Sequence, residues 1–193
     1  MIASVTNDDV IELFRRVGAL LEGHFRLTSG LHSSGYLQCA LVLQYPGLAE
    51  QLGAALADRT RHLQPTVVLS PALGGIVIGQ EVARALEVRA LFAERQEGAL
   101  TLRRGFTVSE ADRVLVVEDV VTTGGSTRET IAVAIAAGAR VLGAVSIIDR
   151  GTDPTRLDVP FQSLVHLDVP AYPPESCPMC AKGLPVTKPG SRA

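Results

Sequence analysis

Several features are missing from this sequence of 193 residues. It has no tryptophan, and it has no run of roughly 18 or more apolar residues that would predict a membrane-spanning helix. The first residues, Met1 to Asp9, lack the basic and then apolar pattern of a signal peptide. We therefore expect a cytoplasmic protein that has no membrane partner.

The sequence also lacks a large net charge and the number of cysteines that a disulfide-rich protein has. The 18 basic and 20 acidic residues give a formal net charge of −2, which provides no electrostatic footprint for nucleic acid. Three cysteines do not make a disulfide framework. Lysine occurs only at Lys182 and Lys188, so nearly all basic residues are arginines. A chain of this length is expected to form one domain, residues 1–193, around its own core.

The most informative stretch has a strand–loop–helix pattern. Four apolar residues from Val114 to Val117 predict a buried strand, and apolar residues at helical spacing predict a helix from Thr127 to Ala137. The loop from Thr122 to Ser126 lies between them and contains hydroxyls and two glycines. Glycines allow the backbone to approach a ligand closely, and the start of a helix binds anions. The loop is therefore predicted to bind a phosphate.

Two carboxylates, Glu118 and Asp119, follow the predicted strand directly. Such a pair can hydrogen-bond vicinal hydroxyls or place a divalent cation. Beside a phosphate loop, it describes a site for ribose 5-phosphate. The simpler alternative makes Ser126 a helix N-cap, the glycines a turn and the carboxylates solvated charges. Because both features occur in this order, we prefer the site.

The motif from Glu118 to Ser126 resembles the phosphoribosyl-pyrophosphate (PRPP) motif of type I phosphoribosyltransferases, most of all the orotate phosphoribosyltransferases. The similarity continues, more weakly, over most of the chain. It implies an α/β fold in which a mostly parallel sheet of four or five strands has helices on both faces and carries a small N-terminal hood. It also implies a glycosyltransferase (pentosyltransferase) that transfers the phosphoribosyl group from PRPP to orotate and releases pyrophosphate, a Mg²⁺-dependent step of pyrimidine (UMP) biosynthesis.

The same resemblance assigns roles to individual residues. Catalysis is expected of Asp119, Glu118 and Arg103, and orotate binding of Thr122 and Arg150. Mg²⁺ is expected to bind as a complex with PRPP, so no protein metal ligand is assigned. The residues expected to bind PRPP are Arg95, Glu118, Asp119, Val120, Val121, Thr122, Thr123, Gly124, Gly125 and Ser126.

A second strand–loop–helix unit precedes the first. Thr66 to Leu69 predicts a buried strand and Ile76 to Leu86 a helix, which together indicate a parallel sheet. The loop from Ser70 to Gly75 lacks the lysine of a P-loop. It resembles the pyrophosphate loop of phosphoribosyltransferases, which implies a cis peptide at Ala72–Leu73. An earlier helix is predicted from Pro46 to about Arg61.

Residues 96–105 occupy the place of the family's mobile catalytic loop, which reaches the neighbouring active site of a homodimer. Arg95 falls on a position where the family has arginine, whereas Gln96 replaces the usual lysine. Arg103 and Arg104 can supply the positive charge for pyrophosphate, since arginine binds phosphate well. The alternative is that both are solvated charges on a hairpin.

The segment 19–45 resembles the hood that closes over the base, and short strands are expected at 19–21, 25–27 and 36–43. Tyr36 is a candidate to cover the base ring, and Thr28 stands where the family commonly has lysine. A purely structural hairpin is the alternative. Before the hood, residues 7–17 predict an amphipathic helix with Asn7 as N-cap and Gly18 as its stop.

Arg150 follows a strand predicted from Val141 to Ile148. It matches the position at which the family binds the orotate carboxylate, and ligands in open α/β sheets collect where strands end. The alternative is an ordinary surface arginine.

The tail, residues 170–193, is rich in proline and contains Cys177 and Cys180. Their spacing gives half of a zinc site, which Cys39 or a histidine would have to complete. An inert pair and a redox pair are the alternatives.

Two other functions remain open on sequence alone. One is a phosphoribosyltransferase for a purine or uracil, which Arg150 and the hood disfavour. The other is a regulator that senses PRPP and binds nucleic acid, which the balanced charge disfavours.

Overall fold

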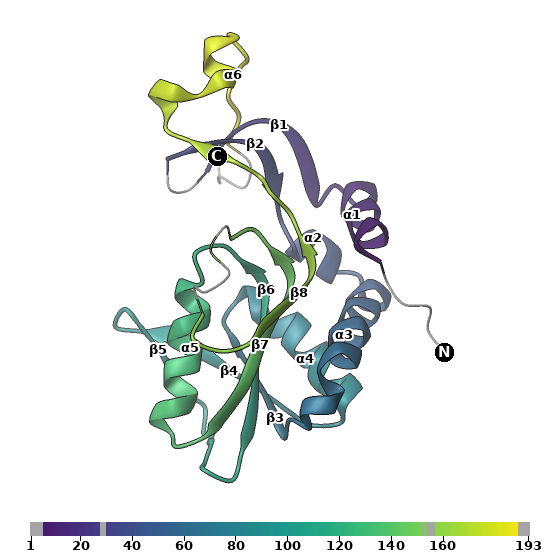
Figure 1. Cartoon of the computed structure of the whole chain (residues 1–193), viewed down its shortest axis with the longest axis vertical. Helices are drawn as coiled ribbons and strands as arrows, with labels where there is room; N and C mark the ends of the chain where they lie inside the picture. The colour runs from purple at the N-terminus through teal and green to yellow at the C-terminus, as the bar shows by residue number, and fades with distance from the viewer. Residues whose placement is uncertain (1–5, 28–29, 152, 154–156, 189–193) are drawn as a thin grey trace.

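The computed structural model describes residues 6–27, 30–151, 153 and 157–188. Within these residues the main sheet has six strands in the order β5-β4-β3-β6-β7-β8 (Figure 1). All neighbours are parallel except β5, which runs antiparallel to β4. The predicted parallel sheet is confirmed, with an added antiparallel edge strand. The strands are β3 (Val67–Pro71), β4 (Arg89–Gln96), β5 (Ala99–Leu102), β6 (Arg113–Val121), β7 (Arg140–Asp149) and β8 (Phe161–His166).

Helices cover both faces of the sheet because its central strands are apolar on both sides. In β6, Leu115 and Val117 pack into the core beneath α3 and α4, whereas Val114 and Val116 belong to the core beneath α5. All four are fully buried. The helices are α1 (Asn7–Arg16), α2 (Ala40–Leu43), α3 (Pro46–Thr60), α4 (Gly74–Leu86) and α5 (Gly125–Ala136), and a short 3-10 turn, η1 (Arg61–Leu63), follows α3.

A small second sheet forms the hood. It contains β1 (Leu20–Arg26), β2 (His32–Leu37) and β9 (Ala171–Tyr172), with β2 in the middle. The chain passes from the end of β8 directly into the hood, so the carboxyl ends of the parallel strands face it (Figure 1). The tail then continues through η2 (Pro174–Ser176) and α6 (Pro178–Ala181). The hood is thus built from both ends of the chain and lies on the side where ligands of such sheets collect.

Four local expectations were wrong. The two short strands expected at 19–21 and 25–27 are a single strand, β1 (Leu20–Arg26). The N-cap of α1 is Thr6 rather than Asn7, since its side chain accepts from the Asp9 backbone and Asp9 accepts from the Thr6 backbone. Residues 40–43 form α2 rather than the end of a strand. Within the predicted loop 96–105, residues 99–102 form β5. Thr28 lies outside the described residues.

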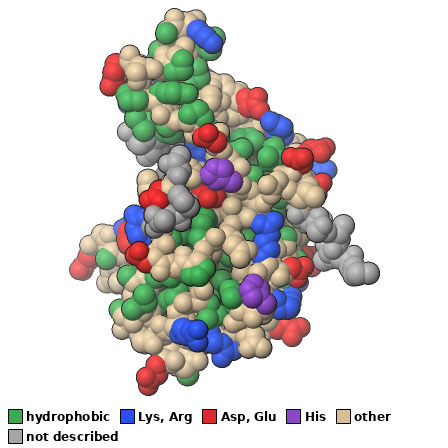
Figure 2. Space-filling model, viewed as in Figure 1, with side chains coloured by type: hydrophobic (Ala, Val, Ile, Leu, Met, Phe, Trp, Pro, Cys, Tyr) green, Lys and Arg blue, Asp and Glu red, His purple; other side chains and the backbone are tan. Residues whose placement is uncertain are grey.

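The visible surface mixes acidic and basic side chains over the main sheet and its helices, and neither sign dominates this face (Figure 2). No helix in the described part of the chain is long and apolar enough to cross a membrane.

Candidate active site

The end of β6 places two carboxylates between two helix starts. Side chains alternate along a strand, so Glu118 follows the residues that face α5 and Asp119 follows those that face α4. Glu118 is only 5% exposed, and it accepts a hydrogen bond from Ser126 Oγ at 2.9 Å. Asp119 is half-buried and accepts from the Val120 backbone at 2.9 Å. The two acids therefore lie between the loop from Thr122 to Ser126 and the loop from Ser70 to Gly75.

Thr122 to Ser126 form a tight turn into α5. Gly124 has φ +75°, and a Cβ there would also lie 2.8 Å from Leu157, so this position requires glycine. The first backbone bond of the helix runs from Arg128 N to Gly124 O at 2.8 Å. The N–H groups before it have no acceptor inside the helix, and the helix dipole adds positive potential. This end of α5 is suited to bind a phosphate.

Glu118 has an unusual protonation equilibrium. The pKa of Glu118 is raised to about 8, chiefly by burial and also by the neighbouring Asp119, although hydrogen bonds from Ser126 and from the Asp119 backbone partly oppose the rise. Glu118 is consequently protonated at neutral pH when no ligand is bound.

The second loop lies against Asp119. The peptide between Ala72 and Leu73 is cis, as predicted, and Ala72 N donates to Ala93 O at 2.7 Å. A Cβ on Gly74 would lie 2.8 Å from both carboxylate oxygens of Asp119, so glycine allows the backbone to approach this acid. Leu73 is 84% exposed. A cavity of about 370 Å³ lies beside Gly74 and Asp119, with Gln38, Leu43 and Val77 among its lining residues.

Arg150 enters the same edge of the sheet from β7. Its backbone N donates to Val121 O at 2.8 Å, which places Arg150 beside Thr122. One guanidinium nitrogen donates to Val169 O at 3.3 Å. The Nε group is buried and has no hydrogen-bond acceptor among the described residues. Burial also lowers the pKa of Arg150 from its usual value. A half-buried cation with a buried, unpaired donor is costly unless an anion binds it.

The three arginines predicted to bind PRPP or pyrophosphate, Arg95, Arg103 and Arg104, lie on or next to the β4–β5 hairpin. Arg95 forms an ion pair with Glu129 on α5 at 3.1 Å. Arg104 donates two hydrogen bonds to Glu94, both 3.0 Å long, and Arg103 lies 3.7 Å from the same carboxylate. The structure thus brings Glu118, Asp119, Ser126, Gly74 and Arg150 to one edge of the sheet and pairs these three arginines with acids elsewhere.

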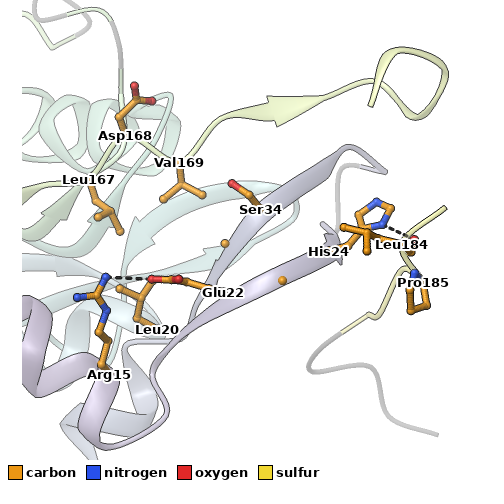
Figure 3. A pocket seen from close by; sticks show the side chains of 12 residues that line it. Arg15, Leu20, Glu22, His24, Ser34, Leu167, Asp168, Val169, Leu184 and Pro185 are labelled. Carbon is orange, nitrogen blue, oxygen red and sulfur yellow. Dashed lines mark hydrogen bonds and ion pairs between the residues drawn. The ribbon is translucent and has the colours of Figure 1, made fainter. Parts of the chain in front are cut away.

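A larger cavity of about 640 Å³ lies between α1, the hood and the segment after β8. The Arg15–Glu22 ion pair crosses one end, and His24 with its hydrogen bond to Leu184 O lies at the other (Figure 3). It contains none of the residues predicted to bind PRPP or orotate.

Comparison with known proteins agrees with this geometry. A family model described as the phosphoribosyl transferase domain matches residues 42–168. The orotate phosphoribosyltransferase of Pelotomaculum thermopropionicum is 50% identical over 188 residues, which cover 97% of this chain and 99% of that protein. The chain belongs to the orotate phosphoribosyltransferase family. The family member from Carboxydothermus hydrogenoformans is 51% identical over 186 residues, with 95% and 97% of the two chains covered.

Solved structures of the family share the fold. The Mycobacterium tuberculosis orotate phosphoribosyltransferase, in complex with Fe(III) dicitrate, aligns with a TM-score of 0.71 at 21% identity, covering 83% of this chain and 96% of that one. The enzyme from Aeropyrum pernix aligns with a TM-score of 0.69 at 24% identity, covering 82% and 93%.

Sequence reasoning missed two sets of contacts. The proximity of Gly74 to Asp119 was not foreseen, although a glycine pair after a buried strand is a signal of close backbone approach. The histidines beside Cys177 and Cys180 were not identified either, and no local pattern marks them.

Proposed function

We propose that this protein transfers the phosphoribosyl group of PRPP to orotate, which yields orotidine 5′-monophosphate and pyrophosphate. The observation that carries the proposal is that two features lie at the same edge of the sheet. One is the start of α5, which is suited to bind a phosphate, and the other is Arg150, whose buried Nε has no acceptor among the described residues. Its relatives at about half identity over nearly their full length are orotate phosphoribosyltransferases. The product is a pyrimidine nucleotide, which places the reaction in UMP biosynthesis.

In this proposal the loop from Thr122 to Ser126 holds the 5-phosphate. Glu118 and Asp119 hold the ribose hydroxyls, and protonated Glu118 is then a donor as well as an acceptor. As the bond from C1 to pyrophosphate breaks and the bond to the orotate nitrogen forms, the ribose ring gains positive charge, and the proton of that nitrogen leaves with pyrophosphate. The Asp119 carboxylate stabilises that charge because it is already in place before the reaction.

Pyrophosphate is assigned to the backbone of the loop from Ser70 to Gly75. We further propose that Arg95, Arg103 and Arg104 exchange their carboxylate partners for pyrophosphate when the β4–β5 hairpin closes, within a homodimer. Closure of this kind excludes water from the reacting centre. Mg²⁺ fits the donor chemistry, because carboxylates and diphosphate are the oxygen ligands it prefers, and bound Mg²⁺ would neutralise the leaving diphosphate.

Arg150 is assigned to the orotate carboxylate. An anionic base satisfies both its charge and its unpaired donor, whereas uracil and the purines lack the carboxylate. This assignment makes Arg150 the residue that selects the base.

The test is steady-state formation of orotidine 5′-monophosphate, with orotate and PRPP varied separately. Arg150→Ala is expected to raise the KM for orotate by about 10²-fold, as for loss of a charged hydrogen bond, and to change the KM for PRPP little. Arg140→Ala, at the opposite end of β7, is the control and should leave both unchanged. Equal effects on both substrates would remove Arg150 from base recognition, and no product with the wild-type protein would refute the function.

A further inference from the structure

Two histidines of the hood and two cysteines of the tail meet at one point. His24 lies on β1, His32 lies on β2, and Cys177 and Cys180 flank the first turn of α6. One ligand atom from each residue lies within 4.8 Å of the others. Among the described residues this is the only group of three or more histidine, cysteine or acidic side chains that is arranged to hold a metal ion.

The ligand atoms are spaced nearly as they would be around a tetrahedral ion. His24 Nε2 lies 3.6 Å from Cys177 Sγ and 3.7 Å from Cys180 Sγ, and His32 Nδ1 lies 3.2 Å from Cys180 Sγ. The two histidine nitrogens are 2.9 Å apart. Tetrahedral zinc with nitrogen and sulfur ligands spaces its ligand atoms by about 3.3–3.8 Å. Small shifts of the two rings would therefore complete the tetrahedron.

The surroundings hold the ligands in place. His24 Nδ1 lies 2.9 Å from Leu184 O (Figure 3). An N–H at Nδ1 that donates to this carbonyl leaves the lone pair on Nε2, toward the cysteines, and outer hydrogen bonds of this kind orient metal-binding histidines. His24, His32 and Cys177 are 5%, 7% and 3% exposed, whereas Cys180 is exposed.

The tail contacts both edges of the small sheet that surrounds the cluster. Beyond α6 the chain returns to the outer edge of β1, where Arg26 N donates to Thr187 O and Thr187 N to His24 O, both at 2.8 Å. At the other edge, β9 pairs with β2 through Tyr172 and His32. A sheet of this size buries little apolar surface, and small folds of this kind are commonly stabilised by a metal.

We propose that His24, His32, Cys177 and Cys180 bind one structural Zn²⁺ ion that fastens the tail to the hood. Two thiolates and two imidazoles are the ligands that zinc prefers. Four protein ligands leave no open position, so the site is structural rather than catalytic. Cys39, the third cysteine, lies elsewhere in the core, and the site is complete within one chain.

The ion also bears on the active site. The segment that leads to the tail carries Val169, whose carbonyl accepts from Arg150, and Pro170, whose carbonyl accepts from Ser33 of β2 at 3.0 Å. Metal binding would therefore hold the hood over the edge of the sheet that contains Arg150.

The direct test is the metal content of the full-length protein, measured by mass spectrometry after expression with zinc and gel filtration. We expect about one zinc per chain, and Co²⁺ exchanged into the site should show the absorption of a tetrahedral cobalt–thiolate centre. Cys180→Ser and His32→Ala should each lose most of the bound metal. Cys39→Ala and His62→Ala are the matched controls and should retain it.

Stability gives a second measurement that does not depend on a variant folding. A strong chelator should lower the Tm of the wild-type protein, and added zinc should restore it. Wild-type protein that binds neither zinc nor cobalt would overturn the proposal. So would a Cys180→Ser variant that retains its metal, or a Cys177–Cys180 disulfide that leaves only Cys39 reactive to thiol reagents after unfolding. None of these results depends on transferase activity, so they test the zinc site independently of the proposed function.

Discussion

Replacing Glu118 by glutamine tests the physical account of the acidic pair most sharply. Glutamine keeps an oxygen that can accept the hydrogen bond from Ser126 Oγ, but its side chain cannot ionise. The pKa of Glu118 in the folded protein is about 8, against 4.5 for an unperturbed glutamate. Between these values the unfolded chain releases a proton that the folded chain retains, so the wild-type protein loses stability as pH rises from about 4.5 to 8.

The size of the effect follows from the shift. A difference of about 3.5 units at 1.36 kcal/mol per unit gives at most about 5 kcal/mol, and water entry and local relaxation reduce what is measured. The advantage of Glu118→Gln in free energy of unfolding should be near zero at about pH 4 and should reach several kcal/mol above pH 8.

The assay is urea unfolding of both proteins at a series of pH values, with unchanged m-values as the check that unfolding remains two-state. Glu12→Gln, an exposed position on α1, is the control and should follow the wild-type protein. If Glu118→Gln gains no stability between pH 5 and pH 8, Glu118 is not protonated in the folded protein, and the assigned role is refuted.

Three further predictions follow from the same geometry. Asp119→Asn should lower kcat by at least about 10²-fold, the effect of losing one electrostatic group at a reacting centre, with an unchanged Tm; near-normal turnover would remove Asp119 from the mechanism. Gly74→Ala should raise the KM for PRPP, because its Cβ would lie 2.8 Å from both carboxylate oxygens of Asp119 and would displace that carboxylate. Gly47→Ala, which meets nothing within 4 Å, is the matched control, and equal kinetics of the two variants would contradict this. Thr6→Ala should cost about 1 kcal/mol in chemical unfolding by loss of the α1 cap, and no change would show that the cap contributes nothing.

The centre of the fold was predictable from sequence because its local signals agree. Val114 to Val117 are apolar on both faces of the sheet, the two carboxylates follow, and glycine and hydroxyl residues precede a helix. These signals agree with one another, and together they specify one structure. The loop from Ser70 to Gly75 was predictable from its resemblance to the family, and the cis peptide at Ala72–Leu73 lies where that resemblance placed it.

The errors have physical causes. Residues 40–43 are all apolar, and periodicity cannot distinguish a strand from a buried helix in so short a run. Residues 99–102 became β5 because pairing with β4 satisfies their backbone groups, which a loop assignment did not foresee. The choice of Thr6 over Asn7 is a one-residue difference at a helix boundary, where sequence reasoning is weakest.

The histidine–cysteine cluster could not be predicted from local patterns. His24 and His32 face each other across a hairpin, where β1 is irregular between Glu22 and Phe25. Cys177 and Cys180 arrive from the far end of the chain. Only the return of the tail to the hood makes one cluster of them, and that return is a property of the tertiary structure.

The central claim is tested most directly by PRPP-dependent release of pyrophosphate from the purified protein, with orotate, uracil, adenine, hypoxanthine and xanthine supplied in turn. Because Arg150 favours an anionic base, release is predicted with orotate and not with the other four. Release with another base in preference to orotate, or with none of them, would contradict the account.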